Sequence, residues 1–80
     1  MFYTYILYSE KIDKYYVGYT HDLNLRIHRH NSGWGRFTKR GKPWKLVYSE
    51  EYFTKTKAIK REREIKEKKS RKYIESLIGI

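Results

Sequence analysis

The sequence predicts a small α+β domain in which a three-stranded antiparallel sheet is flanked by helices, in the order β-β-α-β-α-α. Three observations lead to this fold class. Two segments rich in aromatic and β-branched residues are separated by a short charged turn, a third such segment follows, and the stretches after the second and third have a helical apolar period. The 80 residues suffice for one domain, 1–80, with a single core and no cysteine to reinforce it.

The first two strands are expected to form a hairpin. Phe2 to Ser9 has the composition of a strand covered on both faces, and Tyr15 to Tyr19 is its expected partner across the charged turn 10–14. Gly18 inside the second strand indicates that another group needs close access to the backbone, or only that packing is relieved there.

The first helix follows the hairpin. We expect Thr20 to be its N-cap, Asp22 to complement its dipole, and Asn31 to cap its end. Arg26 and His30 are four residues apart and are therefore neighbours on the helix surface. The inward face is predicted to carry Leu23, Ile27 and His30, with Arg26 beside them and Leu25 pointing away.

The rest of the chain supplies a loop, a strand and two helices. The loop 33–43 is rich in glycine and cations, and a third strand is expected at Trp44 to Phe53. Thr54 to Lys68 is predicted to be helical. A short last helix is expected at Ser70 to Ile78, with Tyr73, Ile74 and Leu77 on its inward side.

Glu62 is the unusual residue of the Thr54 to Lys68 helix. At about 100° per residue it lies about 40° from Ala58, inside the apolar arc that Ala58 forms with Ile59 and Ile65. A carboxylate on a core-facing arc is costly to bury unless a positive group meets it. The helix therefore predicts a cationic partner for Glu62.

The charge of the chain favours a polyanionic partner. Nineteen Lys and Arg face nine Asp and Glu, which gives a formal charge of +10. A solubility surface and an anionic membrane surface are the alternative explanations. The chain has no 18-residue apolar run, and its apolar start lacks a basic leader and a cleavage site. A reducing, cytoplasmic location and no membrane association are expected.

Several of these residues stand in a recognisable order. Tyr3-Thr4-Tyr5, Tyr16-Val17-Gly18, Arg26, His30 and Glu62 together resemble the motifs of the GIY-YIG nuclease family, above all its small stand-alone bacterial members, the UPF0213 group. The first triplet departs from the family pattern because it lacks the leading Gly-Ile. The likeness is carried by YVGYTHDLNLR (16–26), HNSG (30–33) and KREREIK (60–66), and spans Tyr3 to about Leu77.

The resemblance implies a metal-dependent endonuclease that hydrolyses DNA phosphodiester bonds. It implies Tyr5, Tyr16, Arg26, His30 and Glu62 as catalytic residues, with Glu62 the single ligand of Mg²⁺ or Mn²⁺. One carboxylate is enough for Mg²⁺, which keeps waters and takes phosphate oxygens as further ligands. The guanidinium of Arg26 suits the non-bridging phosphate oxygens.

The resemblance leaves the identity of the proton acceptor open. Tyr16, helped by Tyr5 or His30, is expected to take a proton from water. A free tyrosine is a poor base because its pKa is near 10, but nearby positive charge favours the phenolate. Tyr19 stands where some relatives have lysine or histidine, so the identity of the base stays open.

Nucleic-acid binding is expected mainly from the loop 33–43, which mixes cations with aromatic rings suited to phosphates and bases. A flexible connection with a hydrophobic anchor is the alternative. No base-reading motif is present, so cleavage is expected to be structure-selective rather than sequence-specific. The predicted nucleic-acid contacts are Tyr19, Trp34, Arg36, Lys39, Arg40 and Lys42.

Simpler interpretations exist for the same residues. Tyr5 and Tyr16 could only pack the sheet, Arg26 and Glu62 could form a structural ion pair, and His30 could bond a helix-end carbonyl. The alternative function is a nucleic-acid-binding adaptor with this fold and little or no catalysis. An RNA-associated structural protein would explain the charge but not the constellation. Oligomeric state and pathway, whether repair, recombination or mobile-element defence, stay open.

Overall fold

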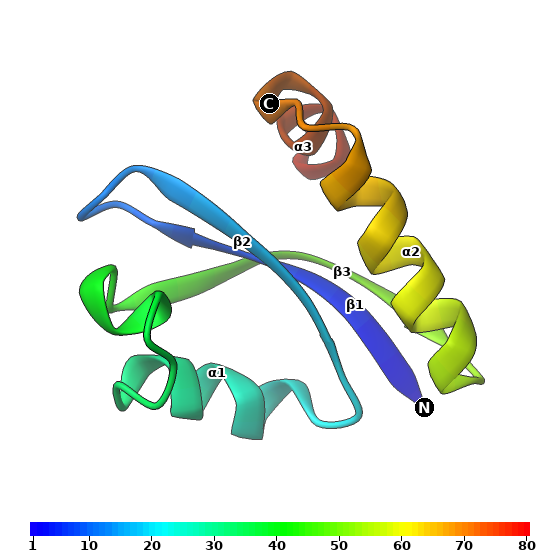
Figure 1. Cartoon of the computed structure of the whole chain (residues 1–80), viewed down its shortest axis with the longest axis horizontal. Coiled ribbons are helices and arrows are strands. Elements are labelled where there is room, and N and C mark those ends of the chain that lie inside the picture. Colours follow the sequence, from blue (N-terminus) through cyan, green and yellow to red (C-terminus); the bar gives the residue numbers. More distant parts are fainter.

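The computed structural model describes residues 1–80 and confirms the predicted fold class (Figure 1). Three antiparallel strands form one sheet in the order β2-β1-β3, and three helices follow the predicted succession. No helix has the length and apolar character needed to span a membrane. The elements are β1 (Phe2–Ser9), β2 (Lys14–Thr20), α1 (Leu23–Asn31), the 3-10 turn η1 (Thr38–Arg40), β3 (Trp44–Tyr52), α2 (Lys55–Glu67) and α3 (Arg71–Ile78).

The central strand β1 brings the two tyrosine triplets together. In the β1–β2 hairpin Tyr5 lies opposite Gly18 and Leu7 lies opposite Tyr16. On its other side β1 pairs with β3, and the register shifts between Ile6 and Leu7. Because both edges of β1 are paired and both faces are covered, its residues 4–7 are buried, as the composition of the segment predicts.

The two faces of the sheet carry separate hydrophobic clusters. Figure 1 shows α1 on one side of the sheet and α2 and α3 on the other. Residues that alternate along a strand point to opposite faces. Tyr5, Leu7 and Trp44 therefore form one cluster, against which the apolar residues of α1 pack. Ile6 and Val17 belong to the second cluster, which includes Ile65 of α2 and the apolar side of α3.

The start of α1 differs from the prediction. Asp22 is its N-cap, and the Asp22 carboxylate accepts a hydrogen bond from the Leu25 amide at 3.0 Å. Thr20 stays extended because it pairs with Tyr3 as the last residue of β2, and its hydroxyl oxygen accepts from the Asp22 amide at 3.1 Å. The predicted N-cap at Thr20 was therefore wrong: strand pairing continues one residue further than the composition suggested.

The end of α1 differs as well. Ser32 is the C-cap, whereas the Asn31 side chain binds the backbone of Trp44. The Asn31 amide donates to the Trp44 carbonyl at 3.2 Å, and the Asn31 oxygen accepts from the Trp44 amide at 2.5 Å. Asn31 thus joins α1 to the start of β3 instead of capping its helix.

The other helices begin as predicted. Thr54 caps α2 by accepting from the Lys57 amide at 3.3 Å, and Ser70 caps α3 by accepting from the Tyr73 amide at 3.1 Å. The third strand ends at Tyr52, one residue before the predicted end, and Phe53 is 84% exposed. The turn η1 inside the loop was not predicted.

Candidate active site

A buried hydrogen-bonded chain links β1, α1 and η1 under the face that α1 covers. The Tyr5 hydroxyl lies 3.0 Å from His30 Nε2, and His30 Nδ1 lies 3.0 Å from the Thr38 hydroxyl. All three side chains belong to buried residues. His30 is therefore held from both nitrogens by side chains, and the alternative that it bonds a helix-end carbonyl was wrong.

Gly18 makes room for this arrangement. A Cβ atom at Gly18 would lie 2.6 Å from the Tyr5 hydroxyl oxygen and 2.8 Å from its Cζ. Such distances are far inside van der Waals contact, so any larger residue would push the Tyr5 ring off the strand. The group that needs close access to the backbone at Gly18, as the sequence indicates, is the ring of Tyr5.

Both ends of the Tyr5–His30 pair are neutral. Burial raises the pKa of Tyr5 well above its usual value; Tyr16 and Glu62 add to the rise and Arg26 opposes it. Burial lowers the pKa of His30, and the charge of Arg26 lowers it further. We assign the phenol, the more acidic of the two hydroxyls, as the donor to Nε2, which leaves Nδ1–H to donate to Thr38.

The ring of Tyr16 packs against the Tyr5–His30 pair, and its hydroxyl has no hydrogen-bond partner in the protein. Its ring meets His30 edge-on with centroids 4.8 Å apart, and the centroid of Tyr5 is 6.3 Å away. The ring of Phe37 stacks on Tyr16 with centroids 6.3 Å apart. The residue is half-buried, and its hydroxyl makes no hydrogen bond to another protein group. The structure thus separates a buried, bonded Tyr5 from a Tyr16 whose hydroxyl is available to water or a substrate.

Glu62 faces inward, as the helical wheel predicts, and its partner is a lysine. Its side chain is 16% exposed, and Lys66 Nζ lies 3.0 Å from its Oε2. Arg26 makes no ion pair, so the alternative of a structural Arg26–Glu62 pair was wrong. Arg26 is half-buried, and its charge reaches both Tyr5 and His30.

Thr4 holds α2 against β1, the strand that carries Tyr5. Its hydroxyl donates to the carbonyl of Ala58 at 2.8 Å, and the residue is fully buried. Ala58 precedes Glu62 by four residues, so this bond holds the helix one turn before the carboxylate. The threonine that replaces the family's usual residue in the first triplet therefore has a structural partner in this chain.

The donor set around Glu62 suits a hard divalent cation. Glu62 Oε1 has no hydrogen-bond partner, and no group of three His, Cys, Asp or Glu side chains that could hold a metal is present. A cation bound there would take one carboxylate from the protein and its remaining ligands from water and phosphate, which is the habit of Mg²⁺. The residues fit Mg²⁺ or Mn²⁺ and do not fit a closed zinc site.

The predicted nucleic-acid residues are spread over the surface. Trp34 is 75% exposed and carries the Arg29 guanidinium 5.2 Å above its ring. Tyr19 is half-buried and, by alternation, lies on the face of β2 opposite Tyr16. The structure does not bring it to the buried chain. The loop cations Arg36, Lys39, Arg40 and Lys42 are all exposed.

Three residues near the site were not among the predicted site residues. Thr38 anchors His30, Phe37 stacks on Tyr16, and Lys66 pairs with Glu62. Lys66 could have been found, because an acid followed four residues later by a lysine is a favourable helical pair. Thr38 and Phe37 gave no such signal, because their places depend on how the loop 33–43 folds.

Comparisons with known proteins relate the chain to one family. A model of the GIY-YIG catalytic domain matches residues 1–74. UPF0213 proteins of Staphylococcus epidermidis and Staphylococcus aureus are each 52% identical over 52 residues, which cover 64% of this chain and 63% of theirs. The match thus spans less than two thirds of these relatives. The solution NMR structure of a UPF0213 protein from Bacillus halodurans has a TM-score of 0.61 and 37% identity, over 99% of this chain and 84% of that one.

Proposed function

The chain belongs to the GIY-YIG family, and from that premise we propose that it is a divalent-metal-dependent endonuclease that cuts DNA by hydrolysis of phosphodiester bonds. Membership implies a nuclease with a nucleic-acid substrate, and nucleases of this family generally use divalent metal ions. The observation that carries the proposal is the free hydroxyl of Tyr16 beside the neutral Tyr5–His30 pair, with Arg26 and Glu62 nearby.

We propose that Tyr16 takes the proton of the attacking water as a phenolate, after its own hydroxyl proton has passed to solvent. It is the tyrosine of the pair whose hydroxyl is not already bonded, and the edge of His30 fixes the direction of its ring. Tyr5, His30 and Thr38 act behind it as positioning residues, because all three are buried and bonded to one another. A base must lie within hydrogen-bond reach of the proton it removes, and among these residues Tyr16 has that reach.

Arg26 is proposed to bind the negatively charged phosphate, and Glu62 is proposed to bind the metal ion. Arg26 has no carboxylate partner, so its guanidinium is free to bind the non-bridging oxygens, on which negative charge builds up during hydrolysis. Glu62 would hold Mg²⁺ or Mn²⁺ through its carboxylate. A divalent cation there supplies Lewis-acid polarisation of the phosphoryl group. Glu62 Oε1 is free to bind a cation, and Lys66, whose side chain is 52% exposed, can move away from Oε2.

We propose that the enzyme selects DNA by shape. The cations of the loop 33–43 are exposed and unpaired, and contacts to phosphates carry no sequence information.

A nicking assay on branched DNA with Mg²⁺ or Mn²⁺ tests the proposal. Tyr16→Phe and Glu62→Ala should lose cleavage while they keep salt-dependent binding. Tyr15→Phe is the matched control, because Tyr15 is the next residue of β2 but bonds Glu75 on the opposite face. If the wild-type protein binds DNA and never cuts with any divalent metal, the chain is a nucleic-acid-binding adaptor instead.

A further inference from the structure

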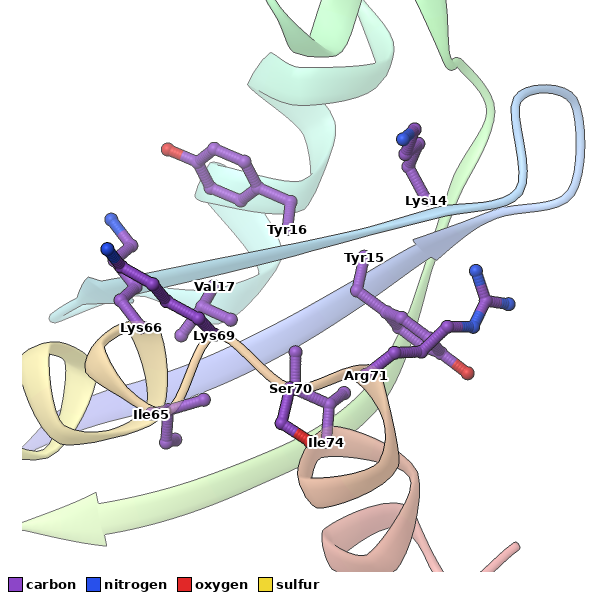
Figure 2. A pocket seen from close by; sticks show the side chains of 10 residues that line it. All are labelled: Lys14, Tyr15, Tyr16, Val17, Ile65, Lys66, Lys69, Ser70, Arg71 and Ile74. Atoms are coloured by element: carbon purple, nitrogen blue, oxygen red, sulfur yellow. The ribbon is translucent and has the colours of Figure 1, made fainter.

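Two grooves lie near Tyr16, one lined by Tyr16 itself and the other by Phe37, which stacks on it. The first, of about 430 Å³, runs between β2 and the junction of α2 with α3; we name it the helix-side groove (Figure 2). The second, of about 470 Å³, lies between the hairpin tip and the loop 33–43; we name it the loop-side groove. The cations of the helix-side groove are Lys14, Lys66, Lys69 and Arg71, and those of the loop-side groove are Lys14, Arg36 and Arg40.

Neither groove has an acidic residue in its lining. The contrast is the hollow on the outer face of α2, where Lys60 and Arg63 lie together with Glu64 and Glu67. Two of the groove cations form ion pairs with acidic residues that are not part of the groove linings. Arg71 pairs with Asp13 and Glu75, and Lys66 pairs with Glu62. Four cations have no ion-pair partner: Lys14, Arg36, Arg40 and Lys69.

Lys14 joins the two grooves. It lines both, and it stands two residues before Tyr16, so both side chains point to the same face of β2. Figure 2 shows Lys14 and Tyr16 on that side of the strand, with Val17 turned the other way toward Ile65. Phe37, which lines the loop-side groove, stacks on Tyr16, which lines the helix-side groove.

The outer edge of β2 has no neighbouring strand. β2 is the edge strand of the β2-β1-β3 sheet. A chain-like ligand can therefore cross the edge from one groove to the other. The succession of unpaired positive groups along such a path suits a ligand with a negative charge on every repeat unit.

We propose that the backbone of the DNA substrate follows this path: from Arg36 and Arg40 in the loop-side groove, past Lys14 and Tyr16, to Lys69 in the helix-side groove. This inference rests on the proposed function, because it takes the substrate to be DNA. The phosphate to be cut lies at the crossing, beside Tyr16. Phe37, 51% exposed, offers a ring to a base on the loop side.

The path revises the predicted binding surface. Arg36 and Arg40 stay in it, whereas Lys14 and Lys69 are new and were not predicted as contacts. Lys39 and Lys42 line neither groove, and Tyr19 lies on the other face of β2. An acidic peptide is the other occupant that the charge would suit.

The test is the binding of a fluorescent branched DNA by the full chain in EDTA, measured by anisotropy over a range of salt concentrations. Lys14→Ala, Arg36→Ala and Lys69→Ala should each weaken binding by about 5- to 10-fold and lower the salt slope by about 1. Lys60→Ala, on the acid-containing face of α2, should change neither. Thermal unfolding confirms that each variant is folded.

A Lys14→Ala protein with the affinity and salt slope of Lys60→Ala overturns the path, as does a wild-type protein that does not bind DNA. Polyglutamate that displaces DNA at equal charge concentration also overturns it, because the site would then prefer an acidic peptide. Binding is measured in EDTA and cutting is measured separately with Mg²⁺ or Mn²⁺, so the two proposals can fail independently. A protein that binds as expected but never cuts with any divalent metal would refute the proposed nuclease activity and leave the path intact.

Discussion

Glu50 of β3 and Glu62 of α2 are carboxylates of similar burial that differ in their hydrogen bonding. The side chain of Glu50 is 21% exposed and that of Glu62 is 16% exposed. Glu50 accepts from the hydroxyls of Tyr48 and Tyr52, and from Arg61 Nε at 3.0 Å and Arg61 Nη2 at 3.3 Å. Glu62 accepts from Lys66 alone.

The difference separates a structural carboxylate from an open one. A carboxylate has about four acceptor positions. Those of Glu50 are filled by donors fixed on β3 and α2, so no position is left for a cation. Glu62 has one long, exposed lysine as its partner, so most of its positions are free. Burial and charge are alike at the two residues; what distinguishes the proposed metal ligand is that its hydrogen bonding is incomplete.

The largest expected effect is the loss of cleavage in Glu62→Gln. The amide keeps the shape of the side chain but is a poor ligand for a hard cation, so the nicking rate should fall at least about 100-fold, or about 2.7 kcal/mol in activation free energy. The free energy of unfolding in urea should change by less than about 1 kcal/mol, because the one ion pair that is lost involves a lysine whose side chain is 52% exposed. A variant that cuts as fast as wild type would remove Glu62 from the mechanism.

Glu50→Gln should show the reverse pattern. It leaves the half-buried Arg61 with only the longer, 3.4 Å contact to Glu64 as counter-charge, so we expect a loss of about 2 kcal/mol in the free energy of unfolding. Glu51→Gln, an exposed neighbour on β3, is the control and should change stability by less than about 0.5 kcal/mol. Cleavage by folded Glu50→Gln should stay at the wild-type rate. Loss of cleavage in the folded variant would mean that the two carboxylates do not have separate roles.

The stability of the domain should depend on pH through Glu50 and Tyr52. Burial acts to raise the pKa of Glu50, but hydrogen bonds from Tyr48, Tyr52 and Arg61 outweigh it and hold the pKa below its usual value. This stability is present above the ordinary carboxyl pKa and is lost as the pH falls through the lowered one. Burial first, and then the bond to Glu50, raise the pKa of Tyr52 to about 12. That contribution is complete below about pH 10 and is lost as the pH rises toward the raised value.

Urea unfolding measured as a function of pH checks both the acid dependence through Glu50 and the alkaline dependence through Tyr52. In Glu50→Gln the carboxyl contribution disappears and the pKa of Tyr52 returns toward its ordinary value. The decline in stability at acid pH and the decline at alkaline pH should both become shallower than in wild type. Identical pH profiles for the two proteins would show that the Glu50 cluster does not govern them.

The smallest expected effect concerns Lys66. Lys66→Met removes the competitor for Glu62 and should tighten Mn²⁺ binding in the absence of DNA by about 2- to 5-fold, the value of an exposed ion pair. Binding can be followed from the decrease of the free Mn²⁺ signal in electron paramagnetic resonance. Lys60→Met, on the other face of α2, should leave the affinity unchanged. Weaker binding in Lys66→Met would show that the lysine does not compete with the metal.

Local signals were enough to predict most of the fold. Composition predicted β1, and the helical apolar period predicted α2 and α3, because these signals act between residues close in the chain. The prediction of an N-cap at Thr20 was wrong because a contact distant in the chain determines the conformation of this residue. Its side chain suits a helix cap, but pairing with Tyr3 across the sheet keeps it in β2. Strand pairing is a long-range contact that overrides a local preference.

The candidate site was predictable in part. The inward direction of Glu62 follows from the helical period, and the neighbourhood of Arg26 and His30 follows from their spacing. The partners of these residues do not. Thr38 reaches His30 only because the loop 33–43 folds back, and no periodic rule relates a loop residue to a helix. The binding of Glu50 by Arg61 likewise depends on how α2 packs against β3.

Mn²⁺ binding to DNA-bound protein tests the contrast between the two carboxylates most directly. Tyr16→Phe serves as the background, since its DNA should stay uncut, and bound Mn²⁺ is counted by electron paramagnetic resonance. Tyr16→Phe alone should bind one Mn²⁺ per chain, and adding Glu50→Gln should leave that site in place, whereas adding Glu62→Gln should abolish it. Equal Mn²⁺ binding with and without the Glu62 carboxylate would contradict the account.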